Sequence, residues 1–119
     1  MSRFARRIRP AVQFELDAAH RAEASGNPDD AFRRLERAHV LGQATTIEHV
    51  RVHWHMSRWA ARRGNTGDAV NQLWRMTAAA MKTGIGWIPL GNTGGSNVSA
   101  FQRMPIPVDL QRLIDAARR

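Results

Sequence analysis

Hydrophobic residues fall at helical spacing on either side of one irregular stretch of the chain. Near the C-terminus, Leu110, Leu113, Ile114 and Ala117 recur at intervals of three and four, which is the pattern of one apolar helix face. Before the irregular stretch, the apolar positions and their flanking polar residues predict four more helices, over residues 10–25, 28–41, 46–63 and 67–83. The sequence therefore predicts an all-α protein.

A repeated phrase marks the turns between these helices. ASGNPDDAFRRLERA (24–38) aligns with RRGNTGDAVNQLWRM (62–76), and each copy reads as a helix end at glycine, a polar cap and a new helix that starts with acidic residues. Thr45 and Glu48 have the spacing of a capping box, which starts the third helix at residue 46. These signals favour two stacked antiparallel helical hairpins, an arrangement that resembles tetratricopeptide repeats.

Residues 84–107 fit neither a helix nor an alternating strand. The stretch is rich in glycine and proline, yet it also carries large apolar residues such as Trp87 and Phe101, so we expect an ordered loop that covers one face of the hairpins. A chain of 119 residues suits one domain. We divide it into a basic N-terminal arm, residues 1–9, and a single helical domain, residues 10–119.

Composition restricts the classes of function. Without cysteine, the chain forms no disulfide, thiolate metal site or cysteine nucleophile. It lacks a secretory signal and an apolar run of the ~20 residues that cross a bilayer, so we expect a cytoplasmic protein without membrane segments. The net charge is +8, but no basic patch is interleaved with aromatic residues, so nucleic-acid binding is not expected.

Three of the five histidines are predicted to converge. His49 and His53 lie four residues apart, hence about 40° apart on one helix face, and Met56 on the same face indicates that this face is packed. In an antiparallel hairpin stack, the end of the second helix lies beside the start of the third helix. His39 should therefore meet His49 and His53, whereas His20 and His55 receive no functional assignment.

Two carboxylates are candidates to join these histidines. Glu15 lies on the first helix near the same end of the stack, and Glu36 precedes His39 by three, the spacing with which helical bundles place two metal ligands on one face. Three imidazoles with one or two carboxylates suit zinc, iron(II), manganese or copper(II). The alternative is a set of hydrogen-bonded core histidines, but each unsatisfied buried group costs about 1–3 kcal/mol. The pattern therefore favours a divalent transition metal.

The loop contains a second candidate site. Gly91, Asn92, Thr93, Gly94 and Gly95 could turn backbone N–H groups inward to hold an anion or an anionic substrate. Their spacing lacks the lysine and threonine that follow the last glycine of a nucleotide-binding P-loop. A simple glycine-rich turn is the alternative, and no catalytic residue is identified.

Three phrases together resemble a known family. LERAHVLGQ (35–43), HVRVHWHM (49–56) and GNTGGSNVSAFQRMPIPVDL (91–110) are similar to the small bacterial proteins of the domain-of-unknown-function family numbered 3703. The resemblance covers nearly the whole chain after residue 9 and implies no activity. It implies that His39, His49, His53 and the GNTGG loop are signature positions.

The sequence as a whole predicts a small cytoplasmic helical protein that binds a transition metal. The protein would then serve metal handling or catalyse a metal-dependent reaction on a small substrate, and whether it is an enzyme stays open. The alternative is a metal-free helical-hairpin module that binds a protein partner. A homodimer is compatible with either interpretation.

Overall fold

Five α-helices make up the part of the chain that the computed structural model describes, residues 1–84 and 104–119. For residue 77 and residues 79–84 only the helical backbone is described. The helices are α1 (Arg3–Ala24), α2 (Pro28–Gly42), α3 (Thr46–Arg62), α4 (Thr66–Gly84) and α5 (Val108–Arg118). No β-strand occurs among the described residues, so the prediction of an all-helical protein is confirmed. Most of the predicted covering loop, residues 85–103, lies outside the described residues.

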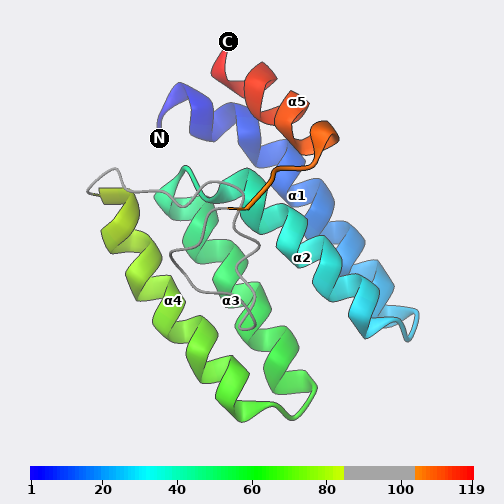
Figure 1. Ribbon diagram of the computed structural model, residues 1–119. Helices are drawn as coiled ribbons and strands as arrows, with labels where there is room; N and C mark the ends of the chain where they lie inside the picture. The colour runs from blue at the N-terminus through cyan, green and yellow to red at the C-terminus, as the bar shows by residue number, and fades with distance from the viewer. Residues whose placement is uncertain (85–103) are drawn as a thin grey trace.

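The helices pack as neighbours in chain order (Figure 1). α1 lies against α2, α3 lies against α4, and α2 also packs against α3, while α5 crosses the N-terminal part of α1 and touches α2. Within the described residues, α2 and α4 both pack on α3 but make no close backbone approach to each other. Side chains from these three helices therefore meet over the surface of α3.

The first helix begins earlier than the sequence pattern predicted. α1 starts at Arg3, where the Ser2 hydroxyl accepts a hydrogen bond from the Ala5 N–H at 3.1 Å, and Pro10 lies inside the helix. Ile8 is only 1% exposed and joins the core one turn before Val12. Burial of this apolar stripe offsets the one backbone hydrogen bond that proline removes. The expected helix start at residue 10 is therefore corrected, because the helix already begins at Arg3.

Both repeated turns contain the predicted helix-ending glycine. Gly26 follows α1 with φ +79° and Gly64 follows α3 with φ +75°, in the left-handed region where glycine carries no steric penalty. Asn27 occupies the N-cap position of α2, although its side chain makes no capping hydrogen bond there. The α1–α2 and α3–α4 connections are therefore short, and each helix pair runs antiparallel (Figure 1).

The turn between α2 and α3 is closed tightly at Gly42. Thr45 caps α3 by accepting a hydrogen bond from the Glu48 N–H at 3.3 Å. A Cβ atom on Gly42 would lie 3.0 Å from the Cβ of Glu48, closer than side chains tolerate without a shift. Glycine at this position lets the end of α2 approach the start of α3, and these are the segments that carry His39 and His49.

Arg37 connects three helices. From α2, its Nε donates to Glu15 Oε1 on α1 at 3.0 Å, and its Nη2 donates to Asp109 on α5. Glu15 is 2% exposed and also accepts from Arg34 at 3.2 Å. The bond to Asp109 is the main reason that the pKa of Arg37 is raised and the pKa of Asp109 is lowered. These ion pairs fix α5 on the α1–α2 hairpin.

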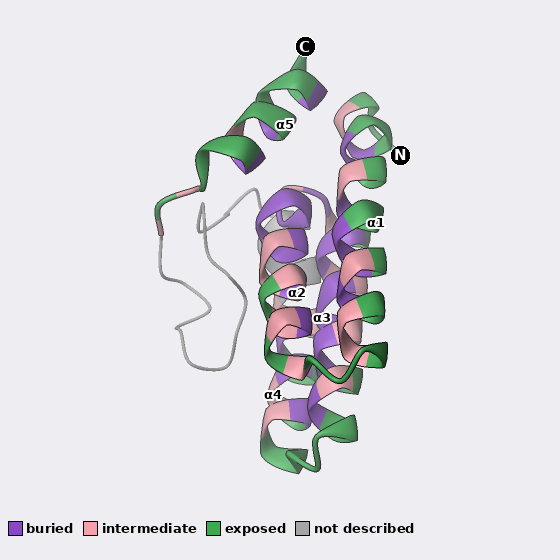
Figure 2. Ribbon diagram, turned by 90° about the vertical axis from the view of Figure 1, so that its right-hand side faces the viewer, coloured by how far each residue is buried: buried purple, intermediate pink, exposed green. Residues whose placement is uncertain are grey.

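Burial follows the helix faces. Figure 2 shows buried residues on the sides by which α1, α2 and α3 pack together and exposed residues on the outer faces. The largest fully buried apolar side chains are Ile8, Val12, Leu41, Val52, Met56 and Leu110. None of the described helices is long and apolar enough to cross a membrane.

Candidate metal centre

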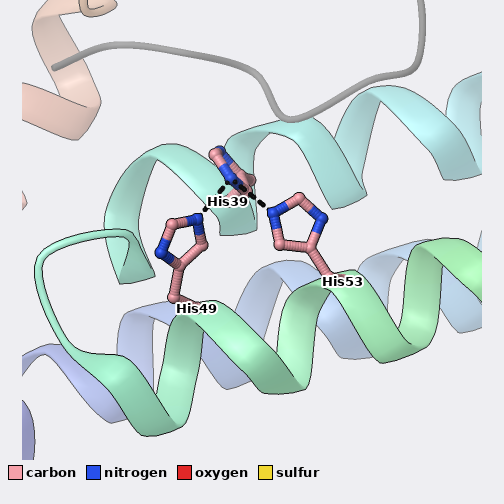
Figure 3. Close-up of side chains that lie close together, drawn as sticks. All are labelled: His39, His49 and His53. Carbon is pink, nitrogen blue, oxygen red and sulfur yellow. Dashed lines mark hydrogen bonds between the residues drawn. The ribbon is translucent and has the colours of Figure 1, made fainter. Parts of the chain in front are cut away.

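Three histidine side chains meet between α2 and α3. Nε2 of His39, on α2, lies 2.9 Å from Nε2 of His49 and 3.1 Å from Nε2 of His53, both on α3 (Figure 3). Each of the three residues is only 2% exposed. The i, i+4 spacing on α3 and the close approach of α2 bring the rings together, so the predicted convergence of these histidines is confirmed.

The separation of the nitrogens suits a shared metal ion. Imidazole nitrogens bound at about 2.1 Å lie about 3.0 Å apart at right angles around the ion and about 3.4 Å apart at the tetrahedral angle. The separations of 2.9 Å and 3.1 Å already match the smaller spacing, and the ligand atoms of all three residues lie within 4.8 Å of one another. Small rotations of the rings would place one ion between them.

Gln72, on α4, determines which nitrogen of the His53 ring carries the proton. Nδ1 of His53 lies 2.6 Å from Oε1 of Gln72, and an amide oxygen only accepts hydrogen bonds. The proton of the neutral His53 ring is therefore on Nδ1, and Nε2 carries a lone pair. An outer hydrogen bond of this kind orients a metal-ligating histidine.

Hydrogen bonds among neutral imidazoles do not satisfy this arrangement well. Because Nε2 of His53 holds a lone pair, His39 must donate its Nε2 proton to form a hydrogen bond there. The same nitrogen also lies 2.9 Å from Nε2 of His49, and one proton cannot serve two in-plane acceptors at full strength. A metal ion accepts a lone pair from each ring, so it satisfies all three nitrogens at once.

The two predicted carboxylate ligands do not join the cluster. Glu15 pairs with Arg34 and Arg37, which lie about 140° and 200° around α2 from His39 and so face away from it. This expectation is corrected because the face of α1 that carries Glu15 packs on the arginine side of α2. Glu36 lies on the wall of a pocket of about 260 Å³, with Arg37, Val40 and the segment around Pro105. Among the residues that the structure describes, the group of potential ligands that lie together consists of the three histidines.

A further carboxylate, that of Glu48, lies next to His49 in the chain but faces α1. Glu48 precedes His49 and is fully buried, and its Oε2 accepts from Nε and Nη2 of Arg51 at 3.1 Å and 2.7 Å. Its Oε1 lies 3.6 Å from Nε of Arg9 on α1. Glu48 is therefore part of the α1–α3 contact.

The remaining two histidines line a different surface. His20 and His55 lie in a groove of about 550 Å³ between α1 and α3, together with Arg58 and Arg62. The pKa of His55 is lowered first by burial and then by the charges of Arg51, Arg58 and Arg62. In agreement with the sequence analysis, neither histidine belongs to the cluster.

The predicted anion loop, Gly91, Asn92, Thr93, Gly94 and Gly95, lies outside the described residues. Sequence reasoning did not identify Gln72, because a glutamine on a helix carries no metal-binding signature of its own. Gln72 could have been found from the antiparallel register of α3 and α4. In this register Ser57 donates to the carbonyl of Ala69, and His53 lies opposite Gln72.

The comparisons with known proteins give a family without an assigned activity. The model of a family described as "Protein of unknown function (DUF3703)" matches residues 6–114. The match includes the three histidines and Gln72. Neither the curated proteins nor the solved structures gave a match.

Proposed function

The chain belongs to the DUF3703 family of proteins of unknown function, and we propose that it binds one transition-metal ion through Nε2 of His39, His49 and His53. The proposal rests on the convergence of three buried imidazole nitrogens on one point. A single buried histidine is usually satisfied by ordinary hydrogen bonds. Three buried rings that present the same nitrogen to one another are the donor set of a histidine metal site, and one ion would accept a lone pair from each ring.

The ligand chemistry narrows the choice of ion. Imidazole is a borderline donor that suits zinc, copper(II) and iron(II), whereas manganese prefers carboxylate and water ligands. Since Glu15 and Glu36 lie outside the cluster, manganese fits the site less well than the other three ions. Gln72 supports this donor set because it holds His53 in the tautomer that ligates through Nε2.

The protein would use the site for metal handling or for a metal-dependent reaction on a small substrate. The ion is not needed to form the main apolar core, because α1, α2 and α5 contribute Ile8, Val12, Leu35 and Leu110 to a cluster of buried apolar residues that contains no histidine. We therefore propose that the protein folds without metal and gains stability when the ion binds.

A second candidate function, binding of a protein partner, is favoured by one observation. The outer faces of α3 and α4 leave Trp54, Val70, Leu73 and Trp74 exposed, with 68% of Trp74 accessible. Exposed apolar groups of this size are typical of interaction surfaces, including those of homodimers. The metal-free version of this function is disfavoured because it gives the buried histidines no role.

The test is a competition between the protein and a chromogenic chelator for Zn²⁺, with the parent chain, His53→Ala and His20→Ala. We expect one ion per parent chain, an apparent affinity at least about 100-fold lower for His53→Ala, and parent-like binding for His20→Ala, whose histidine lies in the other groove. Circular dichroism of each variant checks that the fold is intact. Equal affinities for the parent and a folded His53→Ala would contradict the proposal.

A further inference from the structure

We infer that the metal ion held by His39, His49 and His53 takes a small monoanion from solution as a further ligand. The inference rests on the proposed metal site and follows from the charges of the residues around it. Three imidazoles are neutral ligands, so a divalent ion bound by them keeps its full charge of +2 at a site whose residues are 2% exposed. Burial of an uncompensated charge is costly, which favours an anion at the ion.

The buried carboxylates of the described chain are already neutralised by arginines. Glu15 accepts from Arg34 and Arg37, and Glu48 accepts from Arg51 and lies near Arg9. Moving either carboxylate to the metal would break its ion pairs with the arginines that hold it in the helix interface. Neither residue is therefore available to balance the ion.

The sequence restricts the remaining sources of negative charge. Between Asp68 and Asp109 the chain contains no aspartate or glutamate, no histidine and no cysteine. That interval includes α4 after its first turn and all the residues that connect α4 to α5. Any further protein ligand from this interval would be neutral, so it could not compensate the charge of the ion.

Arg75 adds positive charge on the same side of α4. It follows Gln72 by three residues, hence lies on the same helix face, and it is 7% exposed. In the antiparallel register set by His53 and Gln72, Arg75 lies at the level of the turn that carries His49. Its Nε donates to the neutral Asn71 amide oxygen at 2.9 Å, and burial lowers its pKa. A partly buried guanidinium at this level of α4 would strengthen the attraction of a nearby divalent ion for an anion.

The experiment uses Co²⁺ as a spectroscopic substitute for the native ion and azide as the anionic probe. Visible absorption of protein-bound Co²⁺ reports its ligand number and geometry, so azide binding appears as a saturable change in the spectrum. We expect such a change in the parent chain. Arg75→Gln should weaken azide binding by about tenfold or more, because it removes a charge-assisted contribution. Arg75→Lys, which keeps the charge, should retain more of the azide affinity than Arg75→Gln.

The control variant is Arg58→Gln. Arg58 is an exposed arginine on α3 that lies about 140° around the helix from His53, so its removal should leave azide binding unchanged. A Co²⁺ spectrum that does not respond to excess azide in the parent chain would overturn the inference and leave the metal site standing. Failure of the parent chain to bind Co²⁺, Zn²⁺ or Cu²⁺ would instead refute the proposed metal site. Equal azide affinity in the parent and in Arg75→Gln would refute the contribution of Arg75 to anion binding.

Discussion

His53 and Gln72 are joined across two helices by a hydrogen bond of 2.6 Å from Nδ1 to Oε1. This one contact determines the chemistry of the cluster, because it leaves the lone pair of His53 on the nitrogen that faces His39. Gln72 thus holds the His53 ring with this lone pair towards His39, the orientation that the proposed metal site requires. Gln72 acts as a positioning residue, and its side chain is 2% exposed.

Replacing Gln72 should weaken metal binding without abolishing it. Gln72→Leu removes the acceptor for the His53 Nδ1 proton, and loss of an outer hydrogen bond of this kind lowers metal affinity by about 10-fold to 100-fold. Gln111→Leu, on α5 away from the cluster, is the matched control and should bind like the parent. The measurement is Zn²⁺ affinity by chelator competition. Parent-like affinity in Gln72→Leu would refute the positioning role.

Replacing Glu15 should lower stability and leave metal affinity unchanged. Glu15→Gln removes the buried charge that pairs with Arg34 and Arg37, which should cost about 2–4 kcal/mol in the free energy of unfolding. Asp30→Asn, which breaks an exposed pair with Arg33, should cost less than about 1 kcal/mol. Urea unfolding of the metal-free variants measures both changes. A large loss of Zn²⁺ affinity in folded Glu15→Gln would mean that Glu15 is a ligand after all.

A methyl group at Gly42 should disturb both the fold and the site. In Gly42→Ala the new Cβ would lie 3.0 Å from the Cβ of Glu48, so Glu48 or the start of α3 would have to shift by a few tenths of an ångström, and we expect a cost of about 1–3 kcal/mol. The same shift would move His49 relative to His39 and should lower Zn²⁺ affinity. Gly67→Ala is the control, since its Cβ would meet only Asn65 Oδ1 at 3.8 Å within the helix α4. Thermal unfolding with and without Zn²⁺ measures both effects, and equal behaviour of the two variants would contradict the close-packing argument.

The Arg37–Asp109 pair should make part of the stability depend on pH. Arg37 holds the pKa of Asp109 below its ordinary value of 3.8, so the unfolded chain binds this proton more readily than the folded chain. The stabilisation is therefore present above pH 3.8 and is lost as the pH falls through the lower folded-state value. Because Asp109 is largely exposed, the effect should be below about 1 kcal/mol at pH 7.

The measurement is the difference in unfolding free energy between the parent and Asp109→Asn as a function of pH. We expect the difference to shrink as the pH is lowered below 3.8. A difference for Asp109→Asn that is constant down to acid pH would exclude the ion pair as its cause.

The helix order and the histidine cluster could be predicted because both depend on local spacing. The i, i+4 relation puts His49 and His53 on one face of α3. The short turn after Gly42 then brings the end of α2, which carries His39, next to the start of α3. α1 begins before the predicted residue 10 because Pro10, a residue type that often occupies the first helical position, lies inside this helix. The apolar spacing of Ile8 and Val12 and the capping hydroxyl of Ser2 were the better signals.

The carboxylates were misplaced because their position depends on the rotation of packed helices about their axes. The sequence indicates that Glu15 and His39 lie near the same end of the stack. It does not indicate which face of α2 Glu15 contacts, and in the structure that face carries Arg34 and Arg37 and not His39. Glu36 precedes His39 by three residues and is therefore rotated by about 60°, enough to place it on the wall of the pocket beside Pro105. Gln72 could be found only through the register between α3 and α4.

The most direct test of the central claim is the metal content of the purified protein, measured by elemental mass spectrometry on chains without a histidine tag. The parent chain is compared with the His39→Ala, His49→Ala, His53→Ala triple variant and with His20→Ala, His55→Ala as a control for general histidine binding. We expect about one equivalent of a transition metal in the parent and in the control, and none in the triple variant. The absence of metal from the parent, even after reconstitution with Zn²⁺, Cu²⁺ or Fe²⁺, would contradict the central claim.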